Sequence, residues 1–161
     1  MGILLEEPSI PLQRCPDLEI RIDTPKGRGV FATRNIPAKT VVDICPVLVL
    51  GLAENKEHIE QTSLYHYTYN WPTTDSKNAR TTAQAVIFGL GSMFNHKHEQ
   101  NVVWERDTKR LVITYRAARD IQAGEELCIS YGSHLTFKDT DAPNLPPPET
   151  ELEQLNHIQI D

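Results

Sequence analysis

Short apolar runs, each bounded by turn residues, recur along this chain and limit its fold more than any other feature. Runs of this length flanked by glycine, proline or asparagine are typical of β-strands. We expect strands over residues 18–23, 30–32, 41–50, 65–71, 85–90, 102–104, 111–115 and 123–132. Only residues 53–63 mix polar and apolar positions as a surface helix does. The pattern therefore predicts a mainly β fold.

Three of these regions allow a more detailed prediction. Pro46 lies inside VVDICPVLVL and favours two strands with a bulge or bend between them. Aromatic residues at every second position of YHYTYNW predict one face of a strand over 65–71, followed by a polar loop over 72–82. The expected strands over 102–104 and 111–115 are predicted to form a hairpin with residues 107–109 at its tip.

The composition is that of a soluble, intracellular chain. Its 161 residues, 39% hydrophobic and 24% charged, predict one domain with its own core. The chain has no apolar run long enough for a membrane span and no basic leader for secretion. A net charge of −6 argues against a general nucleic-acid binder. Most of the acidity lies in the last residues, where it would attract a basic partner or keep the chain in solution.

The cysteines and histidines do not form a metal-binding or disulfide pattern. The 3 cysteines are far apart and none forms a CxxC pair, so we expect free thiols. Cys45 and Cys128 fall in apolar strands and are expected to behave as small hydrophobic residues. His96 and His98 lack a nearby third ligand, and we expect no metal.

Composition shifts predict three regions. Residues 1–17 contain several prolines and form an N-terminal arm, residues 18–137 form the domain, and residues 138–161 form an acidic, proline-rich tail. The tail is expected to be partly disordered or a short helix.

The segment AGEELCISYG, residues 123–132, is the most informative strand. Leu127, Ile129 and Tyr131 alternate with polar positions, which points the phenol of Tyr131 inward at the end of the strand. A phenol at such a place can orient a reacting group, or it can cap the edge of the core with its hydroxyl in water. Glu126 is expected to accept a structural hydrogen bond.

Two further segments offer groups for a ligand. Gly27-Arg28-Gly29, in an expected turn over residues 24–29, would let a ligand approach the main chain, although a simple hairpin turn also explains it. It lacks the spacing of a phosphate-binding loop. In GLGSMFNHKHEQN, the small residues permit close packing, and Asn95-His96 presents an amide beside an imidazole.

GRGVFA, MFNH with Asn101 five residues later, and GEELCISYG occur in this order, and together they resemble the motifs of SET-domain protein lysine methyltransferases. The resemblance covers residues 18–137. It is closest to the minimal members that lack flanking zinc modules, such as the small viral and fungal histone H3 lysine methyltransferases. It implies short curved sheets, a C-terminal pseudoknot and one or two short helices.

The chain departs from the family pattern at three places. Lys97, His98 and Gln100 replace the usual serine, cysteine and proline after the Asn-His pair. No cysteine triplet follows the tyrosine, so Leu135 or Phe137 would have to close the pocket. Ile129 stands where many relatives carry an aromatic residue that limits the number of methyl groups.

The resemblance also implies the chemistry and the residues that perform it. The cofactor would be S-adenosylmethionine, with S-adenosylhomocysteine as the product, and Tyr131 would be the catalytic residue that orients the lysine amine. The implied cofactor-binding residues are Gly27, Arg28, Gly29, Phe31, Asn95, His96 and Phe137. The implied substrate channel is formed by residues among Tyr65, Tyr67, Tyr69, Trp71 and Ile129.

Three functions remain open at this point. The chain could methylate histone H3, methylate another protein through a basic segment, or serve as a binding module without activity. The first implies a nuclear protein, with a cytoplasmic location left open, and the minimal relatives suggest a homodimer.

Overall fold

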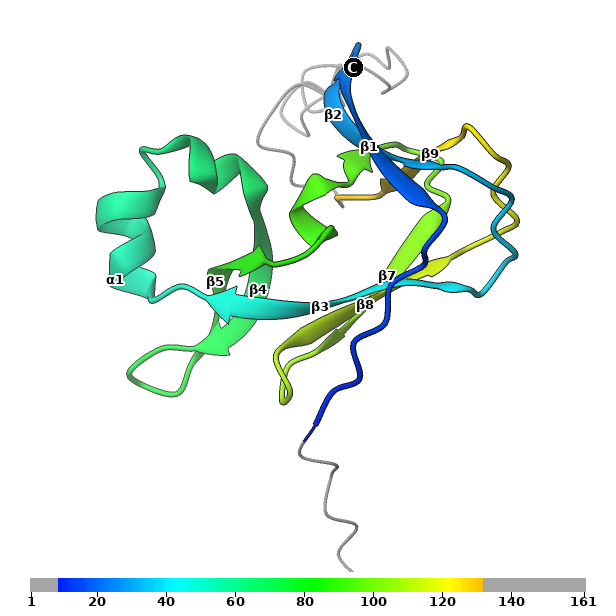
Figure 1. The fold of residues 1–161 in the computed structure, drawn as a ribbon. Helices are drawn as coiled ribbons and strands as arrows, with labels where there is room; N and C mark the ends of the chain where they lie inside the picture. The colour runs from blue at the N-terminus through cyan, green and yellow to red at the C-terminus, as the bar shows by residue number, and fades with distance from the viewer. Residues whose placement is uncertain (1–8, 132–161) are drawn as a thin grey trace, which may run out of the picture.

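The computed structural model describes residues 9–131, which form two curved sheets joined by short helical turns (Figure 1). The strands are β1 (Leu18–Thr24), β2 (Gly27–Ala32), β3 (Val41–Val49), β4 (Thr68–Thr74), β5 (Arg80–Ile87), β6 (Asn95–His96), β7 (Val102–Asp107), β8 (Val112–Ala117) and β9 (Glu126–Ile129). The helical turns are α1 (Leu52–Glu54), η1 (Asn55–Ile59), η2 (Ser63–Tyr67) and η3 (Gly91–Met93). The prediction of a mainly β fold is confirmed.

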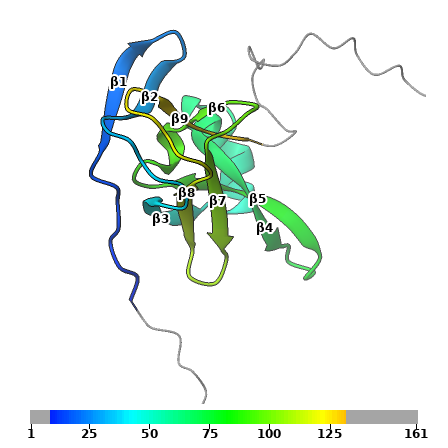
Figure 2. The same ribbon diagram turned by 90° about the vertical axis from the view of Figure 1, so that its right-hand side faces the viewer.

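The strand order shows how distant segments meet. One sheet has the order β1-β2-β9-β6, and the other has the order β4-β5-β3-β8-β7. In the smaller sheet, β9 lies between β2 and β6, so the last described strand joins two segments that are far apart in the chain (Figure 2). The β7–β8 hairpin forms as predicted, with longer strands than expected.

The five-stranded sheet curls until its two edge strands touch. Arg106 of β7 donates a hydrogen bond from Nη2 to the carbonyl of Asn70 on β4 at 2.9 Å, and its guanidinium lies 5.1 Å from the ring centre of Trp71. Tyr69 of β4 meets Trp104 of β7 edge to face, with ring centres 5.7 Å apart. Strong twist in a short sheet brings the edges together, and the cross-edge side chains then hold them.

The prediction of two strands around Pro46 is wrong. β3 is one strand through Pro46, but its partner changes there: residues 13–15 flank its first half and β5 flanks its second half on the same side. Pro46 lies where the partner changes, and its carbonyl accepts the N–H of Phe88, the residue after β5, at 3.0 Å. Its missing N–H therefore falls at the end of the β5 pairing and removes at most the last hydrogen bond of that ladder.

The aromatic segment is also not a single strand. Its first part, Ser63–Tyr67, is a 3₁₀ turn, and β4 begins only at Thr68. The Thr68 hydroxyl donates to the carbonyl of Tyr65 at 2.8 Å and holds this turn closed. Spacing alone could not reveal the turn, because aromatic residues at every second position suit a strand at any point.

The polar stretch 72–82 is mostly strand, contrary to the expected loop. β4 continues to Thr74 and β5 starts at Arg80, so only residues 75–79 connect them. Asp75 accepts N–H groups from Lys77 and Ala79 at 2.8 and 2.9 Å, which closes this tight loop. Cross-strand pairing with β5 outweighs the polar composition.

The alternation expected for β9 holds only in part. Leu127, Cys128 and Ile129 are all buried, since β9 is central in its sheet and covered on both faces. The expected helix over 53–63 is shorter and irregular, with α1 and η1 ending at Ile59. No helix within residues 9–131 combines the length and apolarity needed to cross a bilayer.

The cysteines behave as predicted, and the ends of the chain are only partly described. Cys15, Cys45 and Cys128 are free thiols and are buried. Within the predicted arm, residues 13–15 pair with β3. The predicted tail, residues 138–161, lies outside the described residues.

Candidate active site

Tyr131 is held at both of its ends by the segment around β6. Its backbone N–H donates to Nδ1 of His96 at 3.1 Å, and its hydroxyl donates to the carbonyl of Phe94 at 2.5 Å. The rings of His96 and Tyr131 lie 5.2 Å apart. An Nδ1 that accepts a hydrogen bond carries no proton, so His96 is neutral with its proton on Nε2. Tyr131 and the Asn-His pair therefore form one unit.

Backbone pairing places these residues beside each other. β6 pairs with β9 in parallel, with Asn95 opposite Cys128 and His96 opposite Ile129. The N–H of Lys97 extends the pairing by donating to the carbonyl of Ile129 at 3.0 Å. The close packing predicted before β6 is also present, because a Cβ on Gly91 would overlap the side chain of Ile87.

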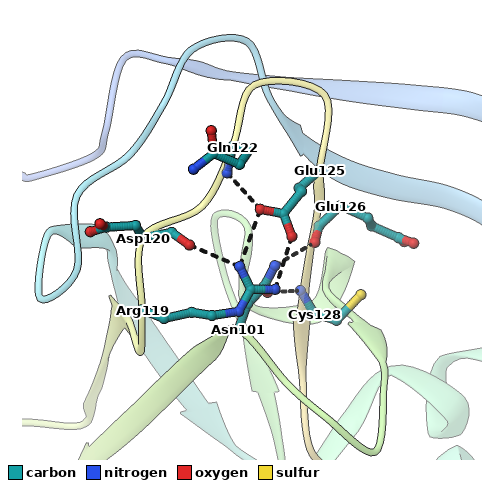
Figure 3. Close-up of polar contacts among 7 residues, drawn as sticks. All are labelled: Asn101, Arg119, Asp120, Gln122, Glu125, Glu126 and Cys128. Carbon is teal, nitrogen blue, oxygen red and sulfur yellow. Dashed lines mark hydrogen bonds and ion pairs between the residues drawn. The ribbon is translucent and has the colours of Figure 1, made fainter.

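The buried side chain of Asn101 acts as an additional ladder partner for β9. Its Nδ2 donates to the carbonyl of Glu126 at 2.8 Å, and its Oδ1 accepts the N–H of Cys128 at 2.8 Å (Figure 3). The sequence motif contained Asn101 but did not reveal this role. The burial of this amide, which shows that it needs partners, is visible only in the structure, so the sequence carried no signal for the role beyond the motif itself.

The loop that precedes β9, residues 119–125, is held closed by contacts between its own side chains. Arg119 makes a two-pronged ion pair with Glu125, and the shorter contact is 2.8 Å (Figure 3). Glu125 also accepts the N–H of Gln122. The guanidinium lowers the pKa of Glu125 below its ordinary value. Both side chains are partly exposed, so this contact shapes the loop more than it stabilises the protein.

The Gly-x-Gly segment, residues 27–29, contacts the Asn-His pair, but it is not the turn that the sequence predicted. The turn is Pro25-Lys26, and β2 already begins at Gly27, whose φ of +82° suits glycine. The amide nitrogen of Asn95 donates to the carbonyl of Arg28 at 2.9 Å and to Oε1 of Glu126 at 2.7 Å. Glu126 is therefore the structural acceptor that the sequence predicted.

Gly29 makes this approach possible. A Cβ at Gly29 would lie 2.5 Å from Oε1 of Glu126 and 3.1 Å from Nδ2 of Asn95, so a larger residue would displace these two hydrogen-bonded side chains. By contrast, nothing lies within 4 Å of a Cβ on Gly27, so the main chain there faces open space. Phe31 is buried under the guanidinium of Arg21, which lies 4.4 Å from its ring centre.

The aromatic residues separate into two groups. Tyr69 donates from its hydroxyl to the carbonyl of Gly91 at 2.7 Å and accepts from the hydroxyl of Tyr115 at 3.0 Å, which ties β4 to the segment before β6. Trp71 is buried in the core. Tyr67 is exposed and Tyr65 is partly exposed.

Two aromatic residues near Tyr131 were missed by the sequence reasoning. Phe94 supplies the carbonyl for the Tyr131 hydroxyl and packs on Tyr115, with ring centres 4.9 Å apart. Trp104 directs Nε1 toward the carbonyl of Ser130 at 3.5 Å. Ile129 is fully buried in the core, and Phe137 lies outside the described residues.

The phenols of this region are neutral at ordinary pH. Burial raises the pKa of Tyr131 to about 12, with smaller contributions from Cys128, Glu126 and Tyr67. Burial also raises the pKa of Tyr69 and of Tyr115 well above the ordinary tyrosine value. Hydroxyls held neutral can donate or accept hydrogen bonds but do not supply a negative charge.

The comparison with family models decides the identity of this arrangement. Residues 27–132 match the SET domain. This chain belongs to the SET-domain family.

A SET domain that carries this motif set is a protein lysine methyltransferase that uses S-adenosylmethionine. The chain is 47% identical over 130 residues to the H3 lysine-37 specific histone-lysine N-methyltransferase of Schizosaccharomyces pombe. This alignment covers 81% of this chain and 82% of that protein. It also resembles the crystal structure of a Plasmodium falciparum protein described as a histone methyltransferase, with a TM-score of 0.54 and 25% identity. That match covers 76% of this chain and 96% of the other.

The described residues of this SET domain fit the cofactor. The amide nitrogen of Asn95 donates to the carbonyl of Arg28 and to Glu126. The amide oxygen of Asn95 accepts no hydrogen bond from residues 9–131, so this oxygen can accept one from an ammonium group. The exposed main chain at Gly27 and Arg28 adds further polar groups without an obstructing Cβ at Gly27. Within residues 9–131, no three His, Cys, Asp or Glu side chains are grouped closely enough to hold a metal ion.

Proposed function

We propose that this enzyme transfers methyl groups to a lysine side chain of histone H3. The observation that supports this substrate most strongly is the 47% identity, over most of both chains, to a relative named for histone H3 lysine-37. The acidic composition of the chain, with a net charge of −6, also suits a basic histone tail.

We assign cofactor binding to the groups that converge on Asn95. The main chain of Gly27, Arg28 and Gly29, with the amide of Asn95, would hold the amino-acid end. The buried His96 would contact the adenine end of the cofactor. Phe31 would support β2, the strand that carries this main chain. Phe137 would stack on the adenine ring, and Leu135 or Phe137 would close the pocket. S-adenosylmethionine, when bound, supplies an electrophilic methyl group on a sulfonium cation.

Tyr131 is the proposed catalytic residue, and its role is to align the lysine amine. The amine of a free lysine has a pKa of about 10.4 and must lose its proton before it can attack. Apolar aromatic walls and a nearby positive charge lower that pKa, so the site needs no strong base. Tyr131 is a neutral phenol anchored through its backbone to His96, and it can orient the amine through its hydroxyl. Alignment of this kind is worth roughly 7–11 kcal/mol of the barrier.

We assign the lysine channel to the aromatic residues that face Tyr131. Tyr67 contributes to the raised pKa of Tyr131, and Tyr131 contributes to that of Tyr69, which supports their proximity. Tyr65 would lie farther out, at the entrance. The burial of Trp71 and Ile129 suits residues that form the wall behind the channel.

The wider setting follows from the proposed substrate. We propose that the domain spans residues 18–137, that the enzyme acts in the nucleus as a homodimer, and that it needs no metal. Nuclear fractionation and sedimentation of the purified protein test the compartment and the oligomer. Activity that persists after chelation would support a metal-independent reaction.

A methyl-transfer assay tests the substrate directly. The full chain is incubated with radiolabelled S-adenosylmethionine and, in parallel, with histone H3, the other core histones and a cell extract depleted of histones. Labelling of H3 that is lost in Tyr131→Phe supports the proposal. Labelling confined to proteins of the depleted extract would reject H3 and favour a non-histone substrate.

A further inference from the structure

A buried carboxylate lies behind the site, outside the motifs discussed above. Asp43, on β3, has only 3% of its surface exposed. Its Oδ1 accepts a hydrogen bond from Nε of Arg14 at 3.1 Å, and its Oδ2 accepts one from Nη2 of Arg14 at 3.0 Å. Oδ2 also accepts the thiol of Cys45 at 3.2 Å and the backbone N–H of Leu90 at 3.0 Å. One carboxylate thus joins the N-terminal arm to the turn that follows β5.

The arm is placed by backbone pairing with β3. The N–H of Ile44 donates to the carbonyl of Gln13 at 3.0 Å, and the N–H of Cys15 donates to the carbonyl of Val42 at 2.9 Å. These groups lie on the half of the β3 edge that β5 does not cover, so the arm satisfies main-chain groups that would otherwise lack partners. Arg14 lies between the two bonds, directly opposite Asp43.

The turn held by Asp43 leads straight to the active site. Gly89 has a φ of +66°, and a Cβ there would lie 2.9 Å from both Arg14 and Asp43. Only glycine lets the chain pass this close to the ion pair. The next residue, Leu90, gives its N–H to Asp43 and is the N-cap of η3. Phe94, the C-cap of η3, supplies the carbonyl that binds the Tyr131 hydroxyl.

The charge balance at Asp43 depends on Arg14. The carboxylate raises the pKa of Arg14, so the guanidinium stays positive at all ordinary pH values. The arginine side chain is 52% exposed and the aspartate side chain is 4% exposed. Removing Arg14 would leave a buried carboxylate without its counter-charge, and such a group draws in water, moves or takes up a proton. Entry of water or movement of the carboxylate disturbs the bond to Leu90.

We propose that Arg14 is a positioning residue for methyl transfer: it neutralises Asp43, which fixes Leu90 and thereby the segment of Phe94 and His96 that holds Tyr131. Arg14 lies before the matched SET region, residues 27–132, so the arm completes the site from outside that region. The inference rests on the proposed role of Tyr131.

The test compares Arg14→Ala, Asp43→Asn and the double variant with the wild type. Arg34→Ala is the matched control, because Arg34 also pairs with an arm residue, Asp17, but at 3.9 Å and with 81% of its side chain exposed. kcat is measured with histone H3 at saturating concentrations, at a temperature at which all variants are folded. Arg14→Ala is expected to lower kcat at least fivefold, and Arg34→Ala to leave it within twofold of the wild type.

The double variant separates positioning from simple stabilisation. An asparagine at 43 carries no charge that needs Arg14, yet its oxygen can still accept the N–H of Leu90. The double variant is therefore expected to have a kcat at least twofold above that of Arg14→Ala and within twofold of that of Asp43→Asn. A folded Arg14→Ala enzyme with wild-type kcat would overturn the proposal, and so would a double variant no better than Arg14→Ala.

Amide hydrogen exchange gives a readout that needs no substrate. The N–H groups of Leu90 and Tyr131 are expected to exchange at least tenfold faster in Arg14→Ala, with protection restored in the double variant and unchanged in Arg34→Ala. If Arg14→Ala does not fold, Arg14→Gln and its Asp43→Asn double are measured with the same criteria. A wild type that labels no histone rejects the proposed substrate, while unchanged exchange rejects the role of Arg14.

Discussion

The backbone N–H of Tyr131 donates to Nδ1 of His96 across 3.1 Å, although the two residues are 35 positions apart. This single bond fixes the tautomer of the imidazole and the direction in which the chain leaves β9. It also explains why the Asn-His pair and the tyrosine act together. The hydroxyl of Tyr131 then bonds to the carbonyl of Phe94, two residues before His96 on the same segment.

Removing the Tyr131 hydroxyl tests its role in alignment. Tyr131→Phe keeps the ring against His96, so we expect cofactor affinity within twofold of the wild type. The rate of methyl transfer should fall at least tenfold, since the group that orients the amine is lost. Calorimetry and single-turnover labelling measure the two quantities.

Tyr115→Phe is a matched control for that change, because it removes a buried hydroxyl that faces Tyr69 in the core. It should cost about 1 kcal/mol of stability and leave the rate within twofold. Full activity in Tyr131→Phe would remove Tyr131 from the mechanism.

The raised pKa of Tyr131, about 12, makes a prediction for alkaline pH. The folded protein holds the phenol proton more tightly than the unfolded chain, whose tyrosine pKa is about 10. This contribution to stability is therefore complete below pH ~10 and is lost as the pH rises toward 12. We expect kcat/KM to rise with pH to about 10, as the lysine amine deprotonates, without a decline from Tyr131. A decline that starts near pH ~9 and disappears in Tyr131→Phe would contradict this assignment.

Ile129 predicts the extent of methylation. Its side chain is smaller than the phenylalanine or tyrosine that limits product size in many relatives, so a lysine that is already methylated should still fit. Mass spectrometry of the product at long reaction times is expected to show dimethyl-lysine or higher forms. A product that stays monomethylated, with cofactor still in excess, would show that another residue sets the limit.

Asn101 and Arg119 provide a comparison between a buried and an exposed polar contact. Asn101→Ala leaves the buried carbonyl of Glu126 and N–H of Cys128 without a partner, at about 1–3 kcal/mol each. We expect a total loss of about 2–6 kcal/mol in urea unfolding. Arg119→Ala breaks only the partly exposed pair with Glu125 and should cost less than about 1 kcal/mol. Equal losses would mean that the side chain of Asn101 is not an essential partner of β9.

Arg106 tests the contact between the two edges of the five-stranded sheet. It lies over Trp71 and Trp104, 5.1 Å from each ring centre, and burial lowers its pKa. Arg106→Ala removes both ring contacts and the bond to Asn70, which should cost about 2 kcal/mol. Arg106→Lys keeps the charge but loses the planar stacking, so it should recover only part of the loss. A lysine variant as stable as the wild type would show that charge alone holds the edges together.

The class of fold and the family could be read from the sequence because both depend on local patterns. Short runs between turns predicted β structure, and three ordered motifs predicted the SET domain. The free cysteines and the structural role of Glu126 also followed, since burial in a strand and a nearby amide decide them.

Other features depended on which strands become neighbours, and no local pattern encodes that choice. Pro46 is tolerated inside β3 because its missing N–H falls at the end of the pairing with β5. The bonds from Asn101 to β9 and from Arg14 to Asp43 span 25 and 29 positions. The sequence by itself determined the strands and the reactive groups, whereas only the tertiary structure decided their partners, because long-range pairing depends on the whole set of buried hydrogen bonds being satisfied at once.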